Sequence, residues 1–470
     1  MSPSASEPAP GMGGRGAARA AVALGASVVL SGVLTSLILT GPAHATEEAP
    51  EPGGPAPSVP VTDPSDVPVP EPSQPAEPTA ITESQARADE YWLDDYGVRD
   101  AWKASRGAGT TIAIIDTGVD GSHPDLKGAV AGGADVSGIG ARNGQEPLGA
   151  DPDHGTMVAS VAAGRGHGSD HSEGIMGVAP EADILAVSTA LGTDEAGVRS
   201  TDEQIPDAVR WAVDNGADVI NMSVGSPQQS WPESWDSAFA YAEEKDVLIV
   251  AAAGNRGNGL VQVGAPATIP SVLTVGGVDQ DGQAGWESSS QGISIAVAGP
   301  AEELVGATPG DGYASWTGTS ASAPIVAGTA ALIRSEHPEL SAQEVAHRIT
   351  ASARDEGEPG KDPLYGYGVL DVNRAVTADL PQMKDSPLGS MEQWIQVHRR
   401  HDSAPSASAT TSGPPLTEDV TTEAKAPEPV EPLNSTGALP IVVLAGFGLL
   451  VAAITVGALR HIRWLLRRGG

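Results

Sequence analysis

The chain has 470 residues, which is longer than one ordinary domain and suggests several units, tails included. It contains 58 Gly and 39 Pro, so much of this length belongs to turns and linkers. The formal net charge of −34 argues strongly against nucleic-acid binding, because a polyanion repels phosphate groups. The absence of cysteine excludes disulfides, thiolate metal sites, Fe–S clusters and a cysteine nucleophile.

The N-terminal residues 1–45 have the parts of a secretory signal peptide. Arg15 and Arg19 precede an uncharged apolar run over residues 20–40, and a small-x-small cleavage site follows at residues 43–45. The run is long for a signal peptide, so an uncleaved membrane anchor remains the alternative. Residues 46–86 form a Pro-rich extension that lacks the apolar side chains needed to repay its ordering entropy, and we expect it to be extended or disordered.

Residues 87–378 have the pattern of a folded α/β domain. Short apolar runs alternate with helical patterns, which predicts a mainly parallel sheet with helices on both faces. Sites in such sheets lie at the carboxyl ends of the strands. The predicted strands cover residues 111–115, 184–187, 219–222, 248–252 and 272–275, and the predicted helices cover residues 154–163, 205–215, 234–244 and 325–334.

The remaining residues predict a membrane anchor. Residues 379–437 form a Pro/Ser/Thr-rich linker, in which residues 391–397 could make a helical turn to which we assign no role. Residues 438–459 contain no charge, and 22 residues at ~1.5 Å each give a helix of about 33 Å, enough to cross a bilayer. A buried core helix is the alternative. The basic tail, residues 460–470, should lie in the cytoplasm, which makes the protein a single-pass protein of the cell membrane with its domain outside.

Three polar residues stand at predicted element ends. Asp116 follows the first predicted strand, His154 opens a helix, and Ser320 precedes an Ala-rich helix. A hydroxyl nucleophile needs a base, and the base needs a carboxylate to fix its tautomer, so the three side chains could form a catalytic site. Each residue also has an ordinary structural interpretation: a turn or cap Asp, a structural His, and a helix-start Ser.

The segments around these residues resemble the signature motifs of the subtilisin-like serine peptidases. The resemblance extends over roughly residues 92–378. It rests on residues 116–119, 154–159 and 318–324, and also on residues 123–126, 177–180 and 365–370.

This resemblance implies a three-layer α/β fold and a specific set of functional residues. Ser320 would be the nucleophile, His154 the general base and then acid, and Asp116 the carboxylate that orients it. The family's oxyanion hole uses the serine N–H and an asparagine side chain, and Asn255 matches that position. Main-chain binding of an extended peptide would fall to Ser223, Val224 and Gly225.

The arrangement of signal, short Pro-rich extension, peptidase domain, linker and C-terminal helix is similar to that of the mycosins. That resemblance implies a membrane-anchored serine endopeptidase that cuts exported polypeptides and has a type VII secretion complex as a partner. The lack of cysteine departs from several mycosins, which have disulfides. A general cell-surface subtilisin-like protease and a catalytically silent scaffold of a secretion complex remain alternatives.

No metal and no cofactor are expected. Asp125 matches a calcium-binding position of some subtilisin relatives, but the companion loop is not recognisable. His167, Asp170, His171 and Glu173 form a local cluster in the sequence that lacks the i,i+4 histidine pair of a zinc helix. We therefore interpret this cluster as a solvated loop.

Overall fold

The computed structural model describes residues 78–193 and 195–399. Outside these residues lie the predicted signal peptide, residues 46–77 of the Pro-rich extension, most of the linker, the predicted membrane helix at 438–459 and the basic tail. Within the described part of the chain, no helix combines the length and the apolar character needed to cross a bilayer.

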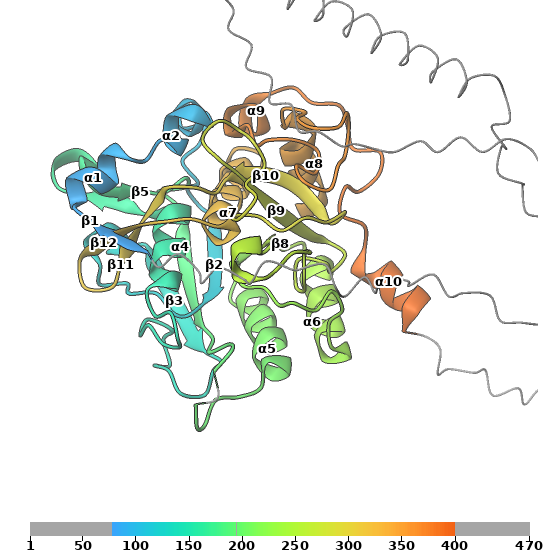
Figure 1. Ribbon diagram of the computed structural model, residues 1–470, viewed down its shortest axis with the longest axis horizontal. Coiled ribbons are helices and arrows are strands. Elements are labelled where there is room, and N and C mark those ends of the chain that lie inside the picture. Colours follow the sequence, from blue (N-terminus) through green and yellow to red (C-terminus); the bar gives the residue numbers. More distant parts are fainter. Residues whose placement is uncertain (1–77, 194, 400–470) are drawn as a thin grey trace, which may run out of the picture. The chain divides into compact units, whose positions relative to one another are not determined.

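A seven-stranded parallel sheet forms the centre of the described structure (Figure 1). Its five inner strands are the five predicted ones, because strands covered on both faces have continuous apolar sequences. In spatial order the strands are β10 (Ile295–Pro300), β9 (Val272–Val278), β8 (Leu248–Ala252), β7 (Val219–Met222), β2 (Thr111–Asp116), β6 (Asp183–Ser188) and β3 (Val130–Asp135).

Helices cover both faces of this sheet, as the α/β prediction requires. On one face, Ile112 and Ile114 of β2 join a core with two helices, α4 (His154–Ala163) and α7 (Thr319–Glu336). On the other face, Ala113 and Ile115 join a second core with α5 (Thr201–Asp214) and α6 (Glu233–Glu244). Alternate side chains of one strand therefore enter two separate cores.

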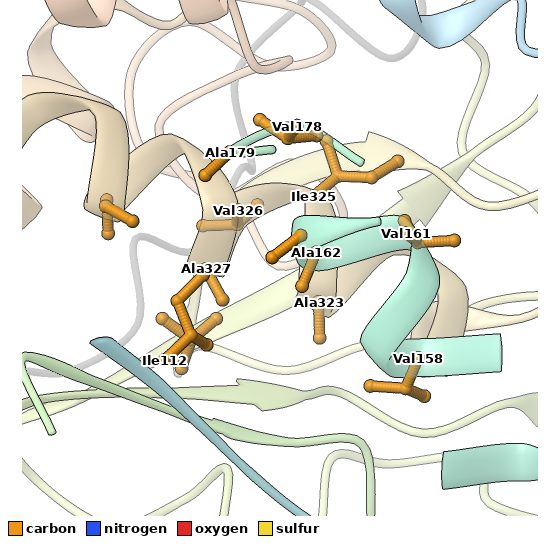
Figure 2. Packing of buried hydrophobic residues seen from close by; sticks show 14 of the residues in the cluster. Ile112, Val158, Val161, Ala162, Val178, Ala179, Ala323, Ile325, Val326 and Ala327 are labelled. Carbon is orange, nitrogen blue, oxygen red and sulfur yellow. The ribbon is translucent and has the colours of Figure 1, made fainter. Parts of the chain in front are cut away.

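Helices α4 and α7 pack together through small side chains (Figure 2). Ala162 of α4 lies beside Ala323 and Val326 of α7 in this core. Gly328 is needed in the same contact, since a Cβ there would lie 2.7 Å from the Val178 Cβ atom and 3.0 Å from the Ala162 carbonyl oxygen. This close approach fixes the position of both helices, and each has a candidate site residue in its first turn.

Helix α7 begins at Thr319, six residues before the predicted start, although Pro324 lies inside it. Proline has no N–H to donate to the carbonyl four residues earlier, which here is that of Ser320. The Ser223 hydroxyl donates to this carbonyl instead, at 2.8 Å. The helix therefore continues across the proline because a side chain from another segment satisfies the freed oxygen.

The packed region extends beyond residues 87 and 378, the predicted domain boundaries. At its N-terminal end β1 (Thr79–Ile81) pairs with β12 (Gly312–Trp316), which also pairs with β11 (Leu304–Thr308). At the other end α10 (Met391–His398) packs on α6, where the Met391 N–H donates to the Glu243 carboxylate at 2.8 Å. The other elements are α1 (Glu83–Ala88), α2 (Trp92–Asp95), α3 (Val98–Ala101), β4 (Arg165–His167), β5 (Glu173–Met176), α8 (Ala342–Ser352) and α9 (Val372–Thr377).

Glu90 is a buried carboxyl group that links the segment after α1 to β5. Its side chain accepts from the Met176 N–H at 2.6 Å and from the Arg87 guanidinium at 3.1 Å. Burial raises the pKa of Glu90 to about 8, although the charge of Arg87 acts in the opposite direction.

Replacing Glu90 with Gln should reduce the loss of stability that accompanies a rise in pH from about 4.5 to about 8. The folded state keeps the Glu90 proton up to about pH 8, whereas the unfolded chain loses it near the ordinary value of 4.5. Between these values the folded state binds more protons, so Glu90 makes the free energy of unfolding fall by up to about 1.4 kcal/mol per pH unit as pH rises. Denaturant titrations of wild type and Glu90→Gln across this range test it. Asp89→Asn, on the exposed neighbour, should leave the slope unchanged.

Candidate active site

Asp116 and His154 form the central contact of the candidate site. Asp116 is the last residue of β2 and is 1% exposed, and His154 is the first residue of α4. The imidazole Nδ1 atom lies 2.7 Å from the Asp116 Oδ1 atom, which also accepts from the Thr117 N–H at 2.8 Å. The Nδ1–H group therefore donates to the carboxylate, and Nε2 is left to accept a proton.

The turn after β2 determines where α4 begins. The Gly155 N–H donates to the Thr117 hydroxyl at 3.0 Å, and an added Cβ at Gly155 would lie 2.2 Å from the Gly118 carbonyl oxygen. Only glycine fits at this contact. The Asp-Thr-Gly turn at residues 116–118 therefore contacts the His-Gly pair at residues 154–155 closely, and this contact brings the imidazole to the carboxylate.

The surroundings of His154 change its proton affinity. Burial lowers the pKa of His154, but the charge of Asp116 and its hydrogen bond raise it, with a further contribution from Asp151, so that the pKa lies above its usual 6.5. The Trp316 ring meets the imidazole edge to face, with centroids 5.5 Å apart. Only 17% of the His154 side chain is exposed, so the imidazole has a largely fixed orientation.

Ser320 is the second residue of α7 and makes a reciprocal contact with Ser223. Its hydroxyl donates to the Ser223 carbonyl at 3.3 Å, while the Ser223 hydroxyl donates to the Ser320 carbonyl. Asn221 donates in turn to the Ser223 hydroxyl at 3.0 Å. Within the described residues the Ser320 hydroxyl makes no hydrogen bond with His154. In this rotamer the hydroxyl is therefore paired with the residue that follows β7 rather than with the imidazole.

The Asn255 side chain is fixed beside the start of α7. Its Oδ1 atom accepts from the Thr319 N–H at 2.8 Å and from the Thr319 hydroxyl at 2.9 Å. A backbone N–H can only donate, so the oxygen faces Thr319 and the amide NH₂ group points elsewhere. An added Cβ at Gly318, whose φ is 140°, would lie 2.5 Å from the Asn255 Nδ2 atom. Gly318 thus lets an amide donor approach the chain just before Ser320.

The segment of Ser223, Val224 and Gly225 directly follows β7, the strand next to β2. None of the three residues belongs to a helix or strand in the described structure, and Gly225 is exposed. The Leu260 side chain lies near both Gly225 and Gly254. The segment therefore offers backbone groups at the carboxyl edge of the sheet, where an extended peptide could pair with it.

Sequence reasoning missed the residues that orient this site. Thr319 fixes the Asn255 amide, Trp316 packs on His154, and Asn221 holds the Ser223 hydroxyl. Thr319 had a detectable signal, since it lies inside the Gly-Thr-Ser motif next to Ser320. Asn221 lies only two residues before Ser223, whereas the contact of Trp316 with His154 joins distant segments.

A family model described as the subtilase family, peptidase S8, matches residues 107–368, more than half of the chain. The chain belongs to the subtilase family. This subtilase is 37% identical to subtilisin DY of Bacillus licheniformis over 275 residues, which are 57% of this chain and 92% of that relative. It is 35% identical to subtilisin E of Bacillus subtilis over 271 residues, which are 57% of this chain and 66% of the relative.

Solved structures similar to this subtilase include mycosins. The MycP3 protease from the type VII (ESX-3) secretion system has a TM-score of 0.54 and 31% identity, covering 64% of this chain and 92% of that one. MycP1 from Mycobacterium smegmatis has a TM-score of 0.54 and 29% identity, covering 65% of this chain and 89% of that one. The predicted family, α/β fold and serine endopeptidase class are confirmed.

Proposed function

We propose that this subtilase hydrolyses peptide bonds with Ser320 as nucleophile, His154 as base and Asp116 as the carboxylate that orients and stabilises the imidazole. The observation that supports this most strongly is the 2.7 Å contact between Nδ1 of His154 and the buried Asp116 carboxylate. This contact leaves Nε2 as the acceptor for the Ser320 proton. Ser320 lies at the N-terminus of α7, where the helix dipole favours the negative charge that develops on attack.

The reaction requires the Ser320 hydroxyl to turn from the Ser223 carbonyl toward His154. Its oxygen then bonds to the substrate carbonyl carbon as Nε2 takes the proton, and the carbonyl electron pair moves to the oxygen. The imidazolium returns the proton to the leaving amine as the C–N bond breaks, which forms the acyl-enzyme. Water repeats the steps on the acyl group and releases Ser320.

The substrate would lie along Ser223, Val224 and Gly225 as an added strand. A substrate N–H that donates to the Ser223 carbonyl would compete with the Ser320 hydroxyl for the same acceptor. Binding of the peptide would thereby favour the Ser320 rotamer that faces His154.

A fluorophosphonate probe tests the nucleophile. The probe should label the purified full chain at neutral pH, and Ser320→Ala should abolish labelling. Ser335→Ala is the matched control, because Ser335 lies on the same helix and bonds to the distant Ala108 carbonyl. A folded wild type that takes up no probe would instead support the catalytically silent scaffold.

Replacing Asn255 with Ala should lower kcat by about 10²–10³-fold with little change in KM. The Asn255 NH₂ group and the Ser320 N–H would donate to the oxyanion, which exists only after attack. Steady-state kinetics on a peptide substrate measures the effect. Asn258→Ala, an exposed change in the same turn, should leave kcat intact. A change confined to KM, with kcat unaltered, would rule out the oxyanion role.

We further propose that the enzyme is anchored in the cell membrane by residues 438–459 and cuts exported polypeptides on the outer side, as part of type VII secretion. The uncharged run with its basic flank supports the anchor, and the likeness to MycP1 and MycP3 supports the secretion role. Membrane fractionation, and protease access to the domain in intact cells, test the topology. If disruption of the gene left type VII export unchanged, a general surface protease would be favoured.

A further inference from the structure

Three metal-ligating side chains from two distant segments meet beside the β4–β5 hairpin, away from the candidate active site. Glu83 lies in the first turn of α1, His167 ends β4, and Glu173 begins β5. The His167 Nε2 atom is 3.3 Å from a Glu83 carboxylate oxygen and 3.7 Å from one of Glu173. One ligand atom from each residue lies within 4.8 Å of the others.

A buried carboxylate fixes the orientation of the His167 ring. The Nδ1 atom lies 2.6 Å from Asp125, which is fully buried and also accepts from the Ile175 N–H at 2.8 Å. An Nδ1–H that donates to Asp125 leaves the Nε2 lone pair directed at the two glutamates. Carboxylates arranged in this way behind a ligating histidine fix its tautomer and make it a better metal ligand.

The 3.3 Å separation of His167 Nε2 from Glu83 matches two ligands of one small cation, and the 3.7 Å separation from Glu173 is also longer than a direct hydrogen bond. Zinc bonds of about 2.0–2.1 Å in a tetrahedral arrangement place neighbouring ligand atoms roughly 3.3 Å apart. A direct charged hydrogen bond would be about 2.7–2.9 Å. Among the described residues Nε2 makes no hydrogen bond, although two carboxylates flank it.

The surroundings leave room for an ion. Glu83 and Glu173 line a surface hollow that is open to solvent. Gly168 permits the approach of Glu173, because an added Cβ there would lie 2.7 Å from the Glu173 Cδ atom. The nearby Arg87 guanidinium is occupied by Glu90 and by the backbone carbonyls of residues 171 and 173.

We infer that Glu83, His167 and Glu173 bind a zinc ion, with Asp125 as the residue that orients His167. One imidazole nitrogen with carboxylate oxygens suits zinc, whereas calcium prefers oxygen ligands alone. The ion would join α1 to the β4–β5 hairpin and so hold the N-terminal segment, including β1, on the domain. His167 and Glu173 belong to the cluster seen in the sequence, whereas Glu83 does not, and Asp125 orients His167 rather than binding the ion.

Zinc titration of the chelator-treated full chain tests this site. Calorimetry with zinc chloride should show one site, and the double variant Glu83→Gln/Glu173→Gln should lose at least about 100-fold in affinity. The matched control is Asp89→Asn/Asp170→Asn, which removes the same charge from exposed neighbours. Equal zinc affinity in both double variants, or no stoichiometric binding to wild type, would overturn the proposal.

Two further measurements distinguish a specific zinc site from nonspecific adsorption of zinc to the protein surface. Cobalt(II) should give the intense visible absorption of a tetrahedral complex in wild type and in the control, but not in Glu83→Gln/Glu173→Gln. Zinc should also raise the thermal unfolding midpoint of wild type and of the control, but not that of Glu83→Gln/Glu173→Gln. Tighter binding of calcium than of zinc to the same residues would show that the metal class is wrong.

Discussion

Replacing His154 with Ala is expected to lower kcat by about 10⁶-fold, the size of the equivalent loss in subtilisin. The proposed base accepts the Ser320 proton and later returns it to the leaving amine, so both steps fail without the imidazole. The change should leave KM nearly unaltered, because His154 is not proposed to bind the peptide main chain. Peptide hydrolysis followed over hours, with active-site titration of the wild type, measures the difference.

A second histidine variant serves as the control that distinguishes loss of catalysis from loss of the folded structure. His347→Ala removes an imidazole on α8 that bonds to the Pro381 carbonyl and, in the described structure, contacts no candidate site residue, and it should retain wild-type kcat. Both variants should unfold at similar denaturant concentrations. If His154→Ala kept activity within tenfold of wild type, another group would have to be the base.

The inner part of the fold could be predicted because it obeys local rules. The strands β2, β6, β7, β8 and β9 are covered on both faces and appear as continuous apolar runs. The edge strand β3 contains two glycines and is only half-buried, so its sequence resembles a loop. The edge strand β10 is buried, but it ends in Gly-Pro, a pair that is typical of turns.

The ends of the packed region depend on distant partners. The strand β1 has three residues and gains its hydrogen bonds from β12, more than 200 positions later. Glu83 follows it inside the predicted Pro-rich extension, so its meeting with His167 has no local signal. The amino-acid composition of a segment indicates whether that segment can fold alone. It does not indicate whether a distant segment provides a surface on which it can pack.

The residues of the candidate site could be proposed from the sequence, but the rotamer of Ser320 could not. The positions of Asp116, His154, Asn255 and Ser320 follow from the ends of elements and from family motifs. The Ser320 hydroxyl instead donates to the Ser223 carbonyl, and the Ser223 hydroxyl donates to the Ser320 carbonyl that Pro324 leaves without a helical donor. That arrangement joins three segments, and no single motif contains it.

Replacing Asp116 with Asn is expected to lower kcat by about 10⁴-fold and to move the acid limb of the pH profile downward. Asp116 is the largest of the groups that raise the pKa of His154, and a neutral amide removes that effect. In wild type, activity should rise with pH through a pKa above 6.5, because only the neutral imidazole accepts the serine proton. In the variant, the lower pKa makes more of the base neutral at acid pH, although each turnover is slower.

The geometry around Asp116 shows why charge should dominate this loss. Oδ1 accepts from both the Thr117 N–H and His154, whereas Oδ2 is buried without a hydrogen-bond partner among the described residues. An asparagine can place its oxygen at Oδ1 and keep the same imidazole tautomer, at the cost of a buried, unpaired NH₂ worth about 1–3 kcal/mol. Rates and unfolding curves from about pH 5 to pH 9 therefore distinguish the two causes. If the acid limb stayed in place while kcat fell, the imidazole would have lost its orientation or tautomer rather than its electrostatic stabilisation.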